Sequence, residues 1–336
     1  MKKYKDTDYL HVSVRLRAIA HKTAVDSDTL VKIVDSRSVD TAVKMLEEKG
    51  LILSSAVSEG TEGILKRLDK ALTDELNKSY SLVTSIIGSS ELVTLLKVRY
   101  DFQNLKALIK AERLGISPDS MLVDSGNISL KALKDGFRER DKKLLDGVIE
   151  SVSEKAIKES SETGDPQKID LIADKACFEY IMSRSKKSGF DFLSDYFNAK
   201  ADLTNIMIFV RCRRMGKDTE FFSYALLPYA GAVKLEKLKE YYNRPVEDFY
   251  EMLSSTPYRK VFEDFDFENI SVSAMESNIT EYLNSLVRKM NSVAFGPQVV
   301  VGFLLAKENE ISNIRIALSA VASGMDPEKA KEKLRA

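Results

Sequence analysis

The stretch Asp101-Phe102-Gln103-Asn104-Leu105 decides the fold, because the chain repeats its pattern twice more. In each copy an acidic residue is followed by Asn three positions later, by Leu or Ile four positions later and by Gly fourteen positions later. The two further copies are Asp202-Leu203-Thr204-Asn205-Ile206 and Glu310-Ile311-Ser312-Asn313-Ile314, and the three glycines are Gly115, Gly216 and Gly324. The copies lie about one hundred residues apart, which is too long for a typical solenoid repeat, so each repeat should contain several helices.

Two further markers keep the same order along the chain. A short apolar pair precedes each acidic residue by about seventy residues, and a helix-like stretch lies between the pair and the acid. The apolar pairs are Leu30/Ile33, Leu130/Leu133 and Leu235/Leu238, and the helix-like stretches are 68–72, 173–177 and 275–279. The sequence therefore predicts one all-α domain over residues 1–336, built from three similar helical repeats at roughly 1–116, 117–217 and 218–336.

Composition narrows the class of protein. A chain of 336 residues that is 44% hydrophobic can bury a substantial core. Its 51 basic residues balance its 51 acidic ones, which argues against a nucleic-acid binder or a polybasic membrane adherent. The start of the chain has no apolar signal-peptide core, and its most apolar window, 299–306, is much shorter than the roughly 20 residues of a membrane-spanning helix. We expect a soluble protein whose only membrane connection is peripheral.

The sequence offers few metal ligands and no disulfide framework. Its two cysteines, Cys177 and Cys212, and its two histidines, His11 and His21, are too sparse for a zinc site. Such sparse cysteine fits a reducing cytoplasm.

Low counts of Gly (15) and Pro (7) favour helices throughout. Three long helices are predicted near 90–115, 191–216 and 296–324, each ending at a glycine of the repeated pattern. Residues 159–166 are polar and contain Gly and Pro, so they are predicted to form a surface loop. The aromatic connection 221–231 has two interpretations: a linker held to the core by its rings, or a surface that docks a partner.

The repeated acid and Asn lie on the buried side of their helices. At 100° per residue, they share the side of the apolar residues at four, seven and eight positions after the acid. Those apolar residues are Leu105, Leu108 and Ile109; Ile206, Phe209 and Val210; and Ile314, Ala317 and Leu318. Burial of unpaired polar groups costs several kcal/mol, so we expect each pair to bond backbone groups of a neighbouring loop or helix. A catalytic role would need carboxylates that converge on one cleft, and one acid per repeat is a poor way to build it.

Other signs of chemistry are weak. The sequence has no Walker A motif, glycine-rich phosphate loop, HExxH, nucleophile elbow or paired CxxC, so no catalytic, cofactor-binding or metal-binding residue is predicted and no cofactor is expected. The basic run 211–217 could bind an anion, but positive charge at a helix C-terminus also complements the helix dipole. The structural repeat residues Asp101, Asn104, Asp202, Asn205, Glu310 and Asn313 are the only site residues singled out.

The three copies, read as 100–106, 200–206 and 307–315, resemble the C subunit of the archaeal and bacterial A/V-type ATP synthase, whose family includes the d subunit of the eukaryotic V-ATPase. The resemblance covers essentially the whole chain and includes the ending, Gly324-Met325-Asp326-Pro327-Glu328 followed by a basic helix. One departure is Glu310 in place of Asp, which keeps the charge and puts little in doubt beyond local packing.

The resemblance implies a fold of three pseudo-threefold-related helical bundles that form a funnel. It also implies a non-catalytic part of the central stalk, a rotor component that couples the shaft made of the D and F subunits to the membrane proteolipid ring during ATP synthesis or proton or sodium transport. The expected location is cytoplasmic, peripheral at the inner face of the cell membrane as part of the ATPase complex. Two alternatives stay open at the level of sequence: a helical-repeat scaffold unrelated to a rotary ATPase, and an enzyme with an unrecognised helical active site.

Overall fold

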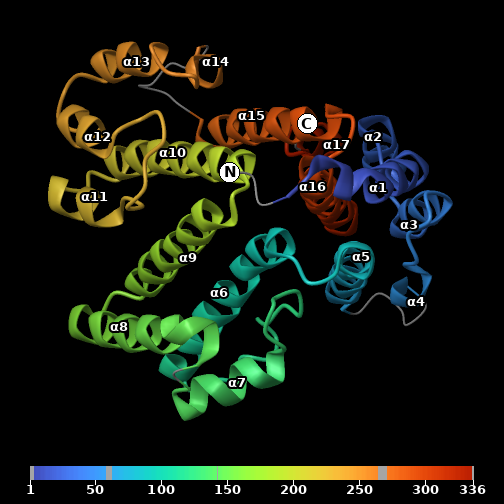
Figure 1. Ribbon diagram of the computed structural model, residues 1–336, viewed down its shortest axis with the longest axis horizontal. Helices are drawn as coiled ribbons and strands as arrows, with labels where there is room; N and C mark the ends of the chain where they lie inside the picture. The colour runs from blue at the N-terminus through green and yellow to red at the C-terminus, as the bar shows by residue number, and fades with distance from the viewer. Residues whose placement is uncertain (1–3, 58–62, 142, 264–270, 335–336) are drawn as a thin grey trace. The chain divides into compact units, whose positions relative to one another are not determined.

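The computed structural model describes residues 4–57, 63–141, 143–263 and 271–334, and within these ranges it contains helices and no strand (Figure 1). The predicted all-α fold is therefore confirmed. The helices that precede each pair of long helices, or lie at the chain ends, are η1 (Asp6–Tyr9), α1 (Leu10–Thr23), α2 (Ser27–Ser36), α3 (Val39–Glu48), α4 (Ser54–Val57), α7 (Leu130–Glu139), η2 (Leu144–Gly147), α8 (Val148–Thr163), α11 (Thr219–Ala225), α12 (Leu235–Tyr241), α13 (Val246–Ser254), α14 (Arg259–Phe262) and α17 (Pro327–Lys331).

Three pairs of long helices follow one another along the chain. They are α5 (Ile64–Ile87) with α6 (Glu91–Leu114), α9 (Gln167–Ser188) with α10 (Asp191–Arg214), and α15 (Val272–Ser292) with α16 (Pro297–Ala322). The second helix of each pair carries the repeated acid, and its bounds agree with the three long helices predicted from the sequence. The helix-like stretches 68–72, 173–177 and 275–279 lie on the first helix of each pair.

The same C-terminal stop ends α6, α10 and α16. Gly115, Gly216 and Gly324 have φ of +65°, +61° and +66°, a backbone conformation that favours glycine. After α6, the N–H of Ile116 donates to the carbonyl of Ala111, and the N–H of Gly115 donates to that of Glu112. The corresponding two bonds occur after α10 and α16, so each helix ends in a Schellman motif.

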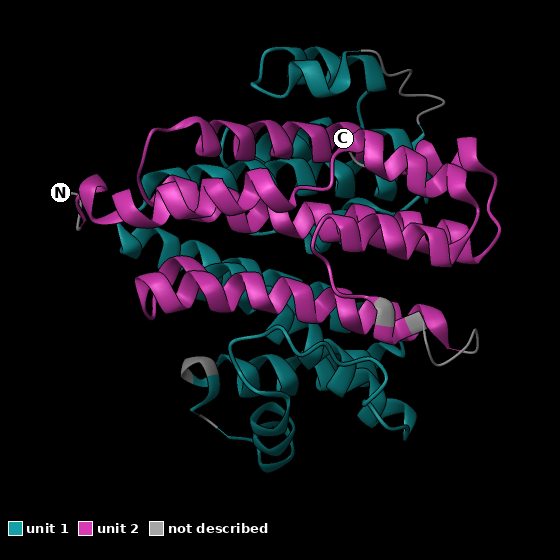
Figure 2. Ribbon diagram, turned by 90° about the vertical axis from the view of Figure 1, so that its right-hand side faces the viewer, with its two compact units in different colours: residues 1, 94–276 teal, residues 2–93, 277–336 magenta. Residues whose placement is uncertain are grey.

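The chain forms two compact units, coloured separately in Figure 2. Unit 1 contains residues 94–276, and unit 2 contains residues 2–93 together with 277–336. The division into three repeats at 1–116, 117–217 and 218–336, and the funnel, stay predictions. Each unit is described by itself below.

In unit 2, α16 is the central helix, because it packs against α1, α2, α3, α5 and α17. Figure 2 shows that this unit joins the two ends of the chain. The residues of α16 from Val299 to Leu305 are all buried, which explains why the most apolar window of the sequence lies here. Gly302 does not break the helix: an ideal Cβ there would lie 2.4 Å from Oδ1 of Asn291, so the glycine permits a close approach to α15. In unit 1, α9 packs against both α8 and α10.

One loop prediction was wrong. Residues 159–163, predicted as part of a surface loop, are the last turns of α8, and only 164–166 lie outside a helix. The polar residues are compatible with a helix because their hydroxyls bond its carbonyls: Oγ1 of Thr163 donates to Glu159 over 2.7 Å. Gly164, with φ +69°, provides the stop.

The aromatic connection 221–231 is held to the core. Phe222 is fully buried, and Leu226 and Leu227 are nearly so. The Nζ of Lys168 lies 3.5 Å from the centre of the Tyr224 ring, and the hydroxyl of Tyr224 donates to Glu159. Of the two interpretations, the linker is the one that this packing supports.

Candidate functional site

The candidate site is the repeated acid with the loop that it holds. In unit 1, Asp101 of α6 is fully buried and accepts hydrogen bonds from the loop before α7. The backbone N–H groups of Asn127 and Ile128 each donate to its carboxylate over 3.0 Å, and Nδ2 of Asn127 donates over the same distance. Ile128 is the residue directly before Ser129, the N-cap of α7. The acid therefore fixes where the next short helix begins.

Asp202 of α10 does the same for α12. It is fully buried and accepts from the backbone N–H groups of Gly231, Ala232 and Val233 at 2.7, 2.7 and 3.3 Å. The hydroxyl of Tyr258, also buried, donates to the same carboxylate over 2.7 Å. Val233 directly precedes the N-cap of α12, as Ile128 precedes that of α7.

Glu310 of α16 makes the third contact, and its loop comes from the other end of the chain. The backbone N–H of Val25 lies near its carboxylate and opposes the rise in the pKa of Glu310 that burial causes. Val25 directly precedes Asp26, the N-cap of α2, so the third contact stands in register with the first two. We call these three the acid–loop contacts. Nζ of Lys307 adds an ion pair with Glu310 at 2.8 Å, and also donates to Oγ1 of Thr23 over 3.0 Å.

Asn104 and Asn205 hydrogen-bond to backbone groups of the segments that precede these loops. Asn104, fully buried, accepts from the N–H of Val123 and donates to its carbonyl, both over 2.8 Å. Asn205, also fully buried, accepts from the N–H of Leu227 over 2.8 Å and donates to the carbonyls of Leu227 and Tyr229. Asn313 is buried on α16. The polar residues that the sequence placed on the buried side of their helices thus meet backbone groups in the first two repeats.

Burial raises the pKa of two of the repeated acids, Asp101 and Glu310. It raises the pKa of the Asp101 carboxyl, and the hydrogen bonds from Ile128 and Asn127 oppose that rise. Burial likewise raises the pKa of Glu310, and the charge of Lys307 opposes it. The loop N–H groups bind the carboxylate of Asp101, and the ion pair with Lys307 binds that of Glu310, so both acids have structural partners.

A second set of contacts, missed in the sequence, links each repeat to the next. The first long helix of each repeat carries an acid within the matched stretches: Asp69, Asp174 and Glu276. Each forms an ion pair with a cation on the second long helix of the preceding repeat. The pairs are Lys106 with Asp174 at 2.8 Å, Arg211 with Glu276, and Arg315 with Asp69 at 2.6 Å. The last of these pairs joins α16 to α5, two helices from opposite ends of the chain.

The basic run 211–217 and the two cysteines make contacts within the protein that account for their positions. Within the basic run 211–217, Arg211 pairs with Glu276, and Nη1 of Arg213 donates to the carbonyl of Arg244. Cys177 and Cys212 are free and buried, and burial raises the pKa of Cys177 to about 12. Among the residues that the structure describes, no three His, Cys, Asp or Glu gather closely enough to hold a metal ion. Over the same residues, no helix has the length and apolarity needed to cross a membrane.

Comparison with known proteins identifies the family. The family model described as ATP synthase (C/AC39) subunit matches residues 12–333. The chain belongs to the ATP synthase (C/AC39) subunit family. All three acid–loop contacts lie inside the matched range.

Curated relatives are named as C subunits of A-type and V-type ATPases. The C subunit of the V-type sodium ATPase of Enterococcus hirae is 25% identical over 315 residues, which is 93% of each chain. The C subunit of the A-type ATP synthase of Methanocaldococcus jannaschii is 22% identical over 97% of this chain and 86% of its own. That of Methanothermobacter thermautotrophicus is 26% identical over 74% of this chain and 69% of its own. This member of the ATP synthase (C/AC39) family is therefore part of an A-type or V-type rotary ATPase complex.

Proposed function

We propose that the chain is a non-catalytic part of the central stalk that couples the shaft of the D and F subunits to the membrane proteolipid ring. The observation that carries the proposal is the match to the ATP synthase (C/AC39) subunit family over residues 12–333. Its relatives are named as subunits of both a sodium ATPase and ATP synthases, so the coupling function is proposed for either direction of the machine. A location at the inner face of the membrane, on the cytoplasmic side, follows from that role.

The acid–loop contacts support a mechanical role. A part that transmits torque must be stiff, and hydrogen bonds that tie neighbouring segments to a long helix restrict the movement of those segments against it. Asp101 and Asp202 tie the start of the next short helix to the middle of a long one through several backbone bonds each. Both carboxylates therefore act as acceptors for the protein's own loops, which favours a structural role in a coupler.

The alternative of a helical-repeat scaffold unrelated to a rotary ATPase does not agree with the family of the chain. The alternative of an enzyme has no observation in its favour.

Omission of the chain tests the proposal. The complex is assembled in vesicles with and without it, and ATP hydrolysis and ion transport are measured on the same sample. We expect hydrolysis by the head and shaft to persist and ion transport to be lost. If hydrolysis by the soluble head and shaft required this chain, or if the purified chain hydrolysed ATP alone, the coupler would be the wrong function.

A variant tests stiffness separately from assembly. Asp202→Ala removes the acid of the second contact, so fewer ions should be transported per ATP hydrolysed while the chain still binds the shaft in a pull-down. The matched control is Glu240→Ala, since Glu240 is an exposed acid that pairs only with Lys237 and Arg244 on its surface among the interactions described. If the two variants transported the same number of ions per ATP hydrolysed, the proposed role of stiffness would be contradicted.

A further inference from the structure

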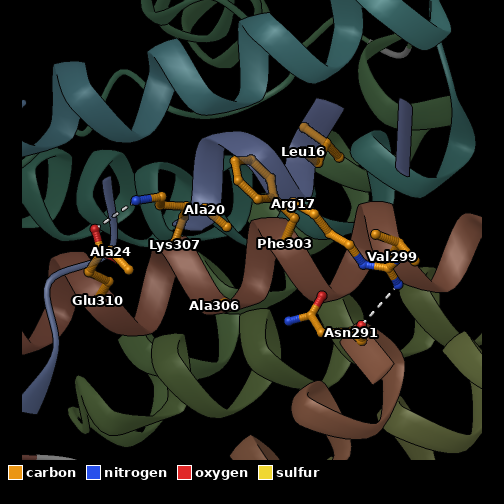
Figure 3. A pocket seen from close by; sticks show the side chains of 10 residues that line it. All are labelled: Leu16, Arg17, Ala20, Ala24, Asn291, Val299, Phe303, Ala306, Lys307 and Glu310. Atoms are coloured by element: carbon orange, nitrogen blue, oxygen red, sulfur yellow. Dashed lines mark hydrogen bonds and ion pairs between the residues drawn. The ribbon is translucent and has the colours of Figure 1, made fainter. Parts of the chain in front are cut away.

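Helix α1 is fixed to unit 2 along one side. It packs against α5 and α16, and its buried side includes Ser13. The N–H of Gly296 donates to Oγ of Ser13 over 3.2 Å. The guanidinium of Arg17 donates to backbone carbonyls of residues 291–294, including that of Asn291 over 3.1 Å (Figure 3). Arg17 thus places a positive charge at the C-terminal end of α15, where carbonyls lack partners within the helix, and these contacts fix the position of α1.

The opposite side of α1 carries an exposed apolar row. Leu10 and Val14 are 50% and 63% exposed, and Ala18 is exposed as well. These three residues are spaced by four, so they form one ridge along the helix, of the kind that packs into a groove on a second helix. In the described part of the chain no element covers this ridge, although burial of its side chains would be favourable.

Basic side chains border the ridge on one side. At 100° per residue, His11, Lys22 and Arg15 lie about 60°, 80° and 100° round the helix from Val14, the middle residue of the ridge. All three are exposed, and none of their side chains makes an ion pair or hydrogen bond to another residue that the structure describes. Among the described helices of eight residues or more, α1 alone carries no acid, and the acids of η1 lie before its first turn. Its outer side is therefore an uncompensated basic face on a chain whose 51 basic and 51 acidic residues balance.

We propose that the outer side of α1 docks an acidic amphipathic helix of another protein in the rotary ATPase complex. The apolar side of that helix packs on the ridge of Leu10, Val14 and Ala18, and its acidic side faces Arg15 and Lys22. Charge complementarity of this kind selects the partner and steers its approach. The docking needs only membership of the complex, so it does not depend on the coupler role.

A protein partner fits this face better than a lipid surface does. The ridge has two large apolar side chains, Leu10 and Val14, and no aromatic one. A helix that lies in a membrane interface buries a broader apolar face than this.

Zero-length crosslinking of the assembled ATPase complex with a carbodiimide tests the docking without any substitution. The reagent activates a carboxylate, and Nζ of Lys22 displaces the resulting urea to form an amide bond. We expect mass spectrometry of the digest to find Lys22 joined to an Asp or Glu of another subunit, and acetic anhydride to modify Lys22 more slowly in the complex than in the free chain. Equal modification of Lys22 in both, or a crosslink only to a second copy of this chain, would overturn the proposal.

Matched substitutions test the ridge and its basic edge. Val14→Asp places a negative charge where the acidic helix packs, so binding to the remainder of the complex, prepared without this chain, should weaken at least about tenfold. The control is Ile52→Asp, at an apolar side chain that is 65% exposed outside α1, and it should change binding less than about twofold. Both positions are exposed, so the thermal unfolding of both variants should match that of the unmodified chain. Equal binding of the two variants would contradict the docking site.

Arg15→Glu separates a protein partner from lipid. It should weaken binding to the remainder of the complex, with a smaller loss at high salt, where charges are screened. If Arg15→Glu left that binding intact and instead abolished binding to phosphatidylglycerol vesicles, the face would belong to a membrane surface and the proposal would be wrong.

Discussion

At the scale of single residues, the buried acids determine which residues can face them. The backbone at Gly126 passes so near Asp101 that any side chain would enter the space of the carboxylate. At Gly231 the same restriction holds less tightly, because the approach is 2.9 Å rather than 2.1 Å. Neither glycine has φ in the left-handed region, so crowding and not backbone conformation requires them.

Substitution of these glycines should follow the order of crowding. Gly126→Ala should lower the free energy of unfolding by about 1–3 kcal/mol, because the new methyl group displaces Asp101 from its loop. Gly231→Ala should cost less. A matched control is Gly115→Ala, where a Cβ meets nothing within 4 Å and only the left-handed conformation costs about 1 kcal/mol. Urea unfolding measures all three, and a smaller cost at Gly126 than at Gly231 would contradict the crowding argument.

The buried carboxyl of Asp101 should also leave a signature in pH dependence. Its pKa is raised in the folded state, so above the ordinary value of 3.8 the folded chain binds more protons than the unfolded chain. Stability from this group is therefore present at low pH and is lost as pH rises through the folded pKa. Asp101→Asn does not titrate, so the deficit in its stability relative to the unmodified chain should be smaller at pH 7 than at pH 4.

Thermal unfolding of both forms across that range measures the deficit. A deficit that grows with pH would mean that the loop hydrogen bonds outweigh burial and hold the pKa below its ordinary value.

The sequence predicted that the acid and the Asn are buried and bond backbone groups, because helical geometry alone decides which side of the helix they occupy. It did not identify Val25 as the partner of Glu310, because that residue lies at the far end of the chain and no periodic pattern connects the two. Nor did it explain Glu in place of Asp at position 310.

At the scale of elements, each long helix is fixed at its end and along its length. The Schellman motifs after Gly115, Gly216 and Gly324 stop α6, α10 and α16 at matched places. Lys106 of α6 pairs with Asp174 of α9, Arg211 of α10 with Glu276, and Arg315 of α16 with Asp69 of α5. In most of these pairs both side chains are substantially exposed. Each pair should therefore add little to the free energy of unfolding, and its main effect is on how the two helices are oriented.

Double-mutant cycles should show this modest energy. For Lys106 with Asp174, and for Arg315 with Asp69, the coupling energy should be about 0.2–1 kcal/mol at low salt and should fall at about 1 M salt, where screening is strong. The comparison pair is Lys237 with Glu240. Both residues lie in α12, so this pair cannot orient one helix against another. Coupling energies that are insensitive to salt would indicate that these pairs are not simple surface ion pairs.

The elements themselves could largely be predicted. Start signals near 90, 191 and 296 and the glycine stops at 115, 216 and 324 predicted α6, α10 and α16 with bounds close to those observed, although Gly302 lies inside the third. The error at 159–163 arose because Ser and Thr are read as loop formers, although a hydroxyl bonded to the preceding turn is compatible with a helix end. The ion pairs between repeats could not be predicted, because charges on exposed helix faces are common and only packing shows which of them meet.

At the scale of the whole molecule, the two ends of the chain depend on each other. Unit 2 is built from residues 2–93 and 277–336, and α16 lies at its centre. The last helix, α17, returns to the first repeat: Ala330 is fully buried, and Lys331 pairs with Asp35 of α2 at 2.9 Å. Local sequence windows do not show such a dependence.

Truncation after Met325 should therefore weaken a segment close to the opposite end. Loss of α17 should reduce the free energy of unfolding of unit 2 by about 1–3 kcal/mol and speed hydrogen exchange in α2, with exchange in α7 unchanged. Lys331→Ala in the full chain, which removes only an exposed ion pair, should cost less than about 1 kcal/mol. If truncation affected α7 as much as α2, the dependence would not be specific to the chain ends.

The third acid–loop contact also governs the order of events during synthesis. Val25 leaves the ribosome early and Glu310 leaves it late, and the roughly 285 residues between them take about 15–60 s to be made at usual translation rates. During that interval the apolar side of α2, formed by Leu30, Ile33 and Val34, has no α16 to cover it. The packing of α2 therefore cannot be completed until α16 has been synthesised, and until then its apolar side is exposed to chaperones and to aggregation.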